Sequence, residues 1–203
     1  MTGGPAHWDE VYSRKRPDQV SWFQPVPEQS LRWIEEAGVP AASAIIDVGG
    51  GASTLVDELL SRGFRDVTVL DISEQVLHQL SERLSRHEFV HFVAEDVTAF
   101  QPTRRYALWH DRAVFHFLTE AAQRHRYRDT LTRATGPGSH VLIATFGPEG
   151  PTRCSGLETA RYDAEQLAAE LGPGFRLVKS AINLHHTPAG ARQQFLYTHF
   201  MRI

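Results

Sequence analysis

The side chains best suited to bind a ligand follow three short apolar runs, each of which we expect to form a strand. The first run, 44–48, leads into the turn Asp47-Val48-Gly49-Gly50-Gly51-Ala52-Ser53. Asp71 closes the second run, 20 residues beyond Gly51 (71 − 51), and Asp96 follows the third. Glycine lets the backbone approach a ligand that a Cβ would exclude, and a carboxylate at the next strand end accepts ribose hydroxyls. The pattern therefore indicates a nucleoside site.

A dinucleotide site would share these features, but the residue at position 54 argues against it. The fingerprint of NAD-binding turns is G-x-G-x-x-G, whose third glycine lets helix and strand pack closely. Thr54 occupies that third position. Asp47, which adjoins the turn, is tolerable near a sulfonium or ammonium cation and less so near a pyrophosphate. The turn thus favours a cationic adenosyl ligand.

Three segments resemble motifs of the class I S-adenosylmethionine-dependent methyltransferases, in the same order and at fitting spacing. Ile45–Ser53 resembles their first motif, Val69–Ser73 their second-strand motif and Ala94–Val97 their adenine-contact segment. The resemblance implies S-adenosylmethionine as cofactor and S-adenosylhomocysteine as product. The residues we expect to bind the cofactor are Tyr12, Trp22, Asp47, Gly49, Gly51, Ser53, Asp71, Ile72, Asp96, Val97 and His110.

The resemblance also implies a role for individual residues of this set. Gly49 and Gly51 underlie the methionine part, Asp71 holds the ribose, and Asp96 with the Val97 amide reads the adenine. Ser53 departs from the pattern, because many members have a third glycine there. Serine is small enough for binding to survive the change.

The segment His87-Glu88-Phe89-Val90-His91 matches the zinc-protease pattern H-E-x-x-H letter for letter. That pattern binds zinc only on a helix, where residues four apart share a face. Here the run continues with aromatic and β-branched residues, which favour a strand over Phe89–Ala94. Histidines four apart on a strand are separated by roughly 13 Å, too far to share one zinc. We therefore expect no metal site.

The segment that follows the fourth expected strand carries the candidate catalytic residues. His110, Asp111, Arg112 and His116 lie in an otherwise apolar stretch, which is costly unless they are paired or line a cleft. His110 or His116 could act as a base, and Asp111 could orient a histidine or bind a cationic substrate. Arg112 could bind an anionic substrate. The alternative is an Asp111–Arg112 ion pair with histidines that are merely hydrogen-bonded.

Further candidates lie at the two ends of the chain. The N-terminal segment resembles caps of small-molecule and some lysine-directed members of the superfamily, in which Tyr12 and Trp22 would close over the cofactor; the alternative is a hydrophobic cap without direct contact. Cys154, on a long loop, could be a substrate-wall residue or a bystander. His185 and His186, between the late strands, give a weak metal signal.

The elements that must position these residues alternate along the chain. Short apolar runs that read as strands are separated by stretches with apolar residues at helical spacing. Strands are expected near 44–48, 67–70, 89–94, 106–109, 140–144, 175–180 and 194–201. Ser73 is expected to cap one helix and Asp163 with Gln166 another. Such alternation predicts an α/β fold with a doubly wound, mostly parallel seven-stranded sheet, preceded by an N-terminal helical cap over residues 1–40.

Bulk properties set limits on the class of protein. The 203 residues suit a single domain, with 41% hydrophobic residues to form a core and 22% charged residues. A net charge of −3 argues weakly against a nucleic-acid partner. The single cysteine excludes an intrachain disulfide, and the absence of a long apolar run argues against a membrane span. We expect a cytoplasmic protein; its oligomeric state is open.

Four functions are weighed. The leading one is methylation of a small molecule at S, N or O, because the chain is compact and lacks a basic run. The alternatives are methylation of protein, with lysine as the acceptor residue, and a non-enzymatic protein that binds the nucleoside. An NAD-linked reductase is disfavoured by Thr54. The methyl acceptor and the need for a general base stay open.

Overall fold

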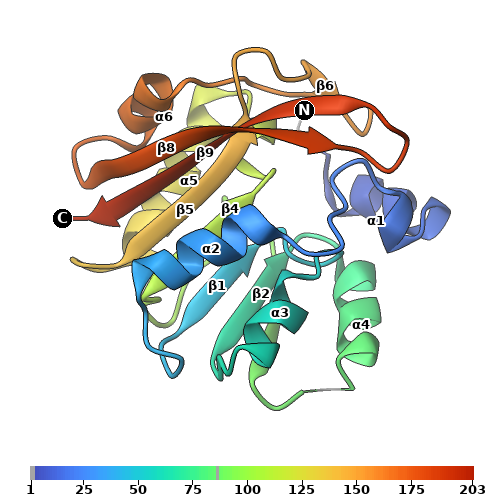
Figure 1. The fold of residues 1–203 in the computed structure, drawn as a ribbon, viewed down its shortest axis with the longest axis horizontal. Coiled ribbons are helices and arrows are strands. Elements are labelled where there is room, and N and C mark those ends of the chain that lie inside the picture. Colours follow the sequence, from blue (N-terminus) through green and yellow to red (C-terminus); the bar gives the residue numbers. More distant parts are fainter. Residues whose placement is uncertain (1–2, 86) are drawn as a thin grey trace.

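The computed structural model describes residues 3–85 and 87–203, and it has two helical layers around one central sheet (Figure 1). The helices are α1 (Pro5–Arg14), η1 (Pro17–Gln19), α2 (Glu28–Ala37), α3 (Leu55–Ser61), α4 (Glu74–Arg83), η2 (Phe115–Phe117), α5 (Ala121–Ala134) and α6 (Ala164–Leu171). The sheet strands are β1 (Ile45–Val48), β2 (Val67–Asp71), β3 (Val90–Ala94), β4 (Leu108–Arg112), β5 (His140–Phe146), β8 (Phe175–His186) and β9 (Arg192–Arg202). A small hairpin consists of β6 (Arg153–Cys154) and β7 (Leu157–Glu158).

The seven strands form a mixed, mostly parallel sheet in the order β3-β2-β1-β4-β5-β9-β8. Strands β1 to β5 run parallel, whereas β9 is antiparallel to both β5 and β8. The register places Asp47 of β1 beside His110 of β4. The expected doubly wound, seven-stranded architecture is therefore confirmed.

The central strands are buried on both faces because helices cover both sides of the sheet. β1 and β2 are buried along their whole length, which is typical of parallel strands in this position. Buried side chains of α2, α3 and α4 pack against one face, and those of α5 and α6 against the other. Figure 1 shows α2 and α3 in front of the sheet and the fainter α5 and α6 behind it.

Local sequence signals set several helix ends as expected. The Ser73 side chain accepts a hydrogen bond from the Val76 amide and caps α4. Asp163 and Gln166 form a reciprocal capping box at the start of α6. Both helix starts predicted from capping chemistry are confirmed.

Two expected boundaries are corrected by the structure. β4 extends to Arg112, so His110, Asp111 and Arg112 lie within the sheet rather than after it. β8 extends to His186, so His185 and His186 lie on that strand rather than between strands. The polar residues at the ends of β4 and β8 do not continue the apolar pattern, so the sequence did not predict either extension.

The N-terminal segment is helical, as expected, and its two parts pack in different places. α2 packs in the same buried cluster as α3, so it belongs to the layer that covers the sheet. Only the segment around α1 and η1 lies at the sheet edge, where α1 contacts α4. Asp9 of α1 accepts a hydrogen bond from the Ser73 hydroxyl at 2.6 Å, which joins this cap to α4.

The literal zinc pattern lies where a strand begins. Val90 and His91 are in β3, as the strand interpretation predicts, while His87 precedes the strand and is exposed. Among residues 3–85 and 87–203, no three histidine, cysteine or acidic residues are grouped so that they could hold a metal ion. Within the same part of the chain, no helix has the length and apolar character of a membrane span.

Candidate active site

A pocket opens at the carboxyl ends of β1, β2 and β4. After β1 the chain proceeds to β2 on one side, whereas β4 pairs with β1 on the other side. Such a topological switch point leaves a crevice in which ligands of doubly wound folds bind. The residues that line the pocket are Gly3, Trp8, Tyr12, Trp22, Val48, Gly49, Leu70, Asp71, Ile72, Glu95, Asp96, Val97, Arg112, Ala113, Val114, Phe117, Leu118 and Cys154.

The glycine turn after β1 contributes Gly49 to the floor of this pocket. Gly49 has φ of +69°, a conformation that L side chains rarely adopt, and a Cβ there would overlap the Val114 side chain. A Cβ on Gly50 would overlap the Asp47 carboxylate, and one on Gly51 would overlap Val76. The turn is therefore restricted to glycine by its own packing, apart from any ligand.

Asp71 lies at the end of β2 and faces the pocket. Its Oδ2 accepts a hydrogen bond from the Gly51 amide at 3.1 Å, and its Oδ1 accepts one from the Ser73 amide at 2.9 Å. The side chain is 5% exposed, and burial raises the pKa of the carboxyl to about 6. Asp71 is therefore largely ionised near neutral pH, and the two amides fix its orientation.

The end of the pocket beyond Asp71 is lined by Ile72, Glu95, Asp96 and Val97. The Asp96 Oδ1 accepts a hydrogen bond from the Thr98 amide at 2.7 Å, which shapes the turn after β3. Val97 is buried, whereas Asp96 is exposed. The residues expected around the nucleoside are thus brought together at one end of the pocket.

Beside the glycine turn, Asp47 and His110 belong to a second, smaller cavity. The His110 Nδ1 lies 2.7 Å from Asp47 Oδ1, and its Nε2 lies 2.9 Å from the Ser30 hydroxyl. The other Asp47 oxygen is buried and has no hydrogen-bond partner among the described residues. Ser53 lines this cavity too, and its hydroxyl accepts a hydrogen bond from the Leu55 amide at the start of α3.

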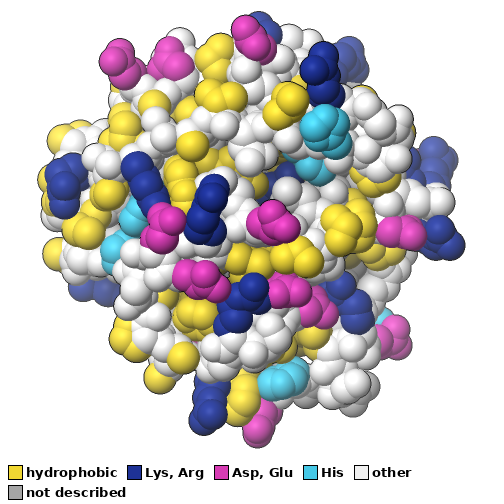
Figure 2. Space-filling model, viewed as in Figure 1, with side chains coloured by type: hydrophobic (Ala, Val, Ile, Leu, Met, Phe, Trp, Pro, Cys, Tyr) yellow, Lys and Arg dark blue, Asp and Glu magenta, His cyan; other side chains and the backbone are white. Residues whose placement is uncertain are grey.

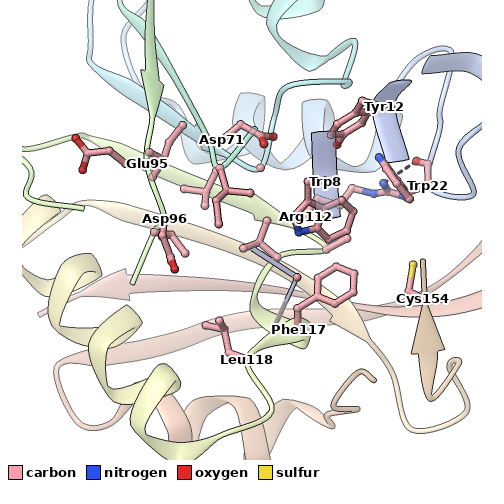
Figure 3. Close-up of a pocket in the computed structure, with 18 residues that line it drawn as sticks. Trp8, Tyr12, Trp22, Asp71, Glu95, Asp96, Arg112, Phe117, Leu118 and Cys154 are labelled. Carbon is pink, nitrogen blue, oxygen red and sulfur yellow. Dashed lines mark hydrogen bonds between the residues drawn. The ribbon is translucent and has the colours of Figure 1, made fainter. Parts of the chain in front are cut away.

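Aromatic side chains from the N-terminal cap close over the pocket. The rings of Trp8, Tyr12 and Trp22 lie 6.0–6.4 Å apart, and Trp8 also contacts Phe117 at 5.2 Å. Figure 3 shows this group across the pocket from Glu95 and Asp96. Tyr12 is buried, and burial raises the pKa of its phenol well above the usual value, so the hydroxyl is neutral.

None of the three expected catalytic residues lines this pocket: His110 lies in the second cavity, and Asp111 and His116 are in the interior. Asp111 is fully buried: its Oδ2 accepts a hydrogen bond from the Tyr127 hydroxyl at 2.6 Å, and its Oδ1 accepts from the Val114 and Phe115 amides. Burial raises its pKa to about 6. The alternative of an Asp111–Arg112 ion pair is wrong, because Asp111 faces Tyr127 instead.

His116 lies in the interior against Phe146. The two rings stack at 4.3 Å, and the His116 Nδ1 accepts a hydrogen bond from the Phe146 amide. Burial lowers the pKa of the imidazole to about 3. A group that stays neutral and has no access to the pocket is poorly placed to take a proton from a substrate.

The candidates in the C-terminal part of the chain, Cys154, His185 and His186, do not lie together. Cys154, on β6, is buried, lines the pocket and has a pKa raised by burial. The His185 Nε2 hydrogen-bonds the Ser21 carbonyl at 2.8 Å and so supports the cap loop, whereas His186 is exposed. The structure thus places Cys154 and Trp22 on the same pocket and His185 behind the cap.

Several pocket residues were missed by the sequence analysis. Trp8, Phe117 and Leu118 form much of the apolar wall. Trp8 and Tyr12 are four residues apart on α1 and share a face, a signal that was available. Phe117 lies next to His116, but the irregular backbone of η2 gave no period from which its direction could be predicted.

Comparison with known proteins finds methyltransferases by family model, by sequence and by structure. A family model described as "Methyltransferase domain" matches residues 45–138. The malonyl-[acyl-carrier protein] O-methyltransferase 2 of Ilyobacter polytropus is 24% identical over 106 residues, which cover 52% of this chain and 40% of the relative. The EEF1A lysine methyltransferase 2 of Danio rerio is 23% identical over 194 residues, which cover 87% of this chain and 77% of the relative. The chain thus spans less than half the length of the first of these relatives.

Solved structures share the fold. A SAM-dependent methyltransferase from Anabaena variabilis superposes with a TM-score of 0.76 at 15% identity, over 98% of this chain and 95% of that one. The N-methyltransferase NodS from Bradyrhizobium japonicum, in complex with S-adenosylhomocysteine, superposes with a TM-score of 0.71 at 15% identity, over 95% and 97%.

Proposed function

Because the chain belongs to the class I S-adenosylmethionine-dependent methyltransferase superfamily, we propose that it binds S-adenosylmethionine in this pocket and methylates a small molecule. The observation that carries the proposal is the pocket at the switch point, with Gly49 and Asp71 at its floor and an aromatic cap above. When bound, the cofactor supplies an electrophilic methyl group on a sulfonium.

The residues of the site fit this cofactor. Gly49 lines the pocket, where its backbone can lie against the methionine chain. Asp47 lies in the second cavity, which adjoins the pocket through the shared Gly49, and its oxygen that lacks a partner suits an ammonium group. Asp71 is fixed by two amides and presents a carboxylate for ribose hydroxyls, while Asp96 and Val97 lie where an adenine would sit. This assignment of individual residues is part of the proposal.

The aromatic cap supports a role in holding the cationic end of the cofactor. The faces of aromatic rings attract cations through the ring quadrupole, and Tyr12, Trp22 and Trp8 all line the pocket. The same rings exclude water, which protects a reactive methyl donor. The cap is held by the Asp9–Ser73 hydrogen bond and by α1 packing on α4.

A small acceptor is favoured by the way the pocket is closed. Trp8, Trp22 and the buried Cys154 of the β6–β7 hairpin wall the side opposite Asp96. A lysine of a folded protein would have to enter between these groups. The alternative of protein lysine methylation is supported by the similarity to the Danio rerio lysine methyltransferase over 87% of this chain.

Transfer of a radiolabelled methyl group from S-adenosylmethionine separates these functions. The purified chain is incubated with small thiols, amines and carboxylic acids in one arm and with cell lysate in the other. The proposal expects label in small molecules. Label confined to protein bands would replace it with lysine methylation, and cofactor binding without transfer in either arm would favour a nucleoside-binding protein.

A further inference from the structure

Arg112 is a largely buried cation whose partners are all neutral. Its Nε donates to the Tyr197 hydroxyl at 2.9 Å, and its Nη1 donates to the Trp22 carbonyl at 2.9 Å. The guanidinium lies 4.7 Å from the centre of the Phe195 ring. Its Nη2 is buried and has no hydrogen-bond partner among the described residues. A charged donor left in this condition is costly unless a ligand pairs with it.

No carboxylate of residues 3–85 or 87–203 forms an ion pair with Arg112. The neighbouring Asp111 points to the opposite face of the sheet, where Tyr127 and two amides occupy it. The carboxylates that line the pocket are Asp71, Glu95 and Asp96. Figure 3 places Glu95 and Asp96 at the far end from Trp22 and Cys154, with Arg112 beside Trp22. The two ends of the pocket therefore carry opposite charge.

The end of the pocket near Arg112 is otherwise apolar. Trp8, Trp22, Phe117 and Cys154 line it, and burial raises the pKa of the Cys154 thiol, so it is neutral. His110 faces the second cavity, which Arg112 also lines, and there Asp47 and Ser30 occupy its two ring nitrogens. Among the described residues at this end, none is placed to remove a proton from an acceptor.

We propose that the methyl acceptor is a small organic anion, a carboxylate or a thiolate, which Arg112 binds through its unpaired Nη2. This inference rests on the proposed function. An anionic acceptor needs no base: its electron pair forms the bond to the methyl carbon while the carbon–sulfur bond breaks, and that bond's electron pair stays on the sulfur. The product is a neutral ester or thioether and a neutral thioether of the cofactor, and no proton is left over.

The same arrangement disfavours an amine, including the side chain of lysine. At neutral pH an alkyl amine is an ammonium ion, which Arg112 repels and which must lose a proton before it can react. Charge complementarity at close range contributes specificity by penalising the wrong sign. Arg112 thus separates the small-anion substrate class from the lysine alternative.

The first test measures binding of matched probes to the chain loaded with S-adenosylhomocysteine. Phenylacetate, phenylacetamide and phenethylammonium share a ring and similar length but differ in charge. Calorimetry is expected to give a dissociation constant for phenylacetate at least about tenfold lower than for phenylacetamide, with phenethylammonium the weakest. Equal or tighter binding of phenethylammonium, or no binding of phenylacetate, would overturn the proposal.

Variants of Arg112 then assign the preference to this side chain. Arg112→Gln is expected to remove the preference for phenylacetate, and Arg112→Lys to retain part of it. Tyr197→Phe is the matched control, because it removes one hydrogen bond to the guanidinium and leaves the charge; its preference should stay within about twofold of wild type. A preference that survives in Arg112→Gln contradicts the proposal.

The affinity for S-adenosylhomocysteine distinguishes the acceptor from the cofactor as the source of the anion. In Arg112→Gln this affinity should stay within about threefold of wild type, which also shows that the variant is folded. A loss there as large as the loss for phenylacetate would mean that Arg112 binds the cofactor carboxylate, and the proposal would be wrong. Failure of the wild-type chain to bind S-adenosylhomocysteine would instead refute the proposed function itself.

Discussion

Three consecutive residues of β4 have three different environments. Side chains alternate between the two faces of a strand, so His110 and Arg112 point to one face and Asp111 to the other. His110 joins Asp47 and Ser30 beneath the glycine turn, Asp111 joins Tyr127, and Arg112 reaches the cap. The chemistry available to each residue follows from this alternation and not from its position in the sequence.

Asp111 is predicted to contribute stability and not catalysis. In Asp111→Asn the amide loses the charge-assisted hydrogen bond from Tyr127, which should lower the free energy of unfolding by about 1–3 kcal/mol. The affinity for S-adenosylhomocysteine should change less than twofold. Denaturant unfolding and calorimetry measure the two quantities. Tyr127→Phe removes the same bond from the other side and also leaves the Trp109 Nε1 donor unpaired, so it should be destabilised at least as much. A variant of normal stability that has lost all turnover would contradict this role.

At the scale of the elements, the glycine turn and η2 must pack together to form the floor of the pocket. Gly49 is in a left-handed conformation and its Cα faces the Val114 side chain. The close approach couples the end of β1 to the segment after β4. A change at Gly49 should therefore alter both the fold and the ligand site.

Gly49→Ala is predicted to reduce both stability and cofactor affinity. Gly63 supplies the matched control, since its φ is +85° but nothing lies within 4 Å of the added Cβ. Gly63→Ala should show only the backbone cost of about 1 kcal/mol, with normal affinity. Gly49→Ala should cost clearly more and weaken binding of S-adenosylhomocysteine at least about tenfold. Equal behaviour of the two variants in thermal unfolding and calorimetry would contradict the packing argument.

Local sequence signals predicted which helices and strands are present, but they did not predict where several of these elements end. Apolar runs predicted the buried strands β1 and β2, and capping residues predicted the starts of α4 and α6. The polar ends of β4 and β8 were missed because tertiary pairing, rather than apolar pattern, holds them in the sheet. The hairpin of β6 and β7 has strands of two residues each, too short for any periodicity.

The same limit explains which parts of the site were predictable. Gly49, Asp71, Asp96 and Val97 lie at strand ends whose order alone brings them to one edge of the sheet. The environments of Asp111 and His116 depend on strand phase and on packing against other elements, which a single sequence does not display. Arg112 was recognised as a candidate for an anionic substrate, but its lack of a counter-ion required the structure.

At the scale of the whole molecule, charge is spread over the surface and several buried titratable groups lie on the sheet. Figure 2 shows acidic and basic side chains interspersed over one face of the molecule. The Nε2 atom of the buried His199 on β9 lies 2.9 Å from Nδ1 of the partly buried His140 on β5. Burial and the neighbouring His140 lower the pKa of His199 to about 4.

This pair is predicted to make stability sensitive to mild acid. The pKa of His199 is lower in the folded chain than the value of about 6.5 expected when unfolded, so its contribution is complete above pH 6.5 and is lost as the pH falls toward 4. Each pH unit in that window costs about 1.4 kcal/mol. Between pH 7 and pH 5, the free energy of unfolding of the wild type should fall by about 2 kcal/mol more than that of His199→Gln. Parallel pH dependence would contradict this.

The central claim is that the pocket binds S-adenosylmethionine through the Asp71 carboxylate, and calorimetry on wild type and Asp71→Ala tests it most directly. Wild type should bind S-adenosylmethionine and S-adenosylhomocysteine, and should not bind NAD. Asp71→Ala should weaken both adenosyl ligands by about a hundredfold, because two charge-assisted hydrogen bonds are lost, whereas Asp96→Ala should weaken them less. Folded wild type that binds neither adenosyl ligand, or an Asp71→Ala variant of unchanged affinity, would contradict the account.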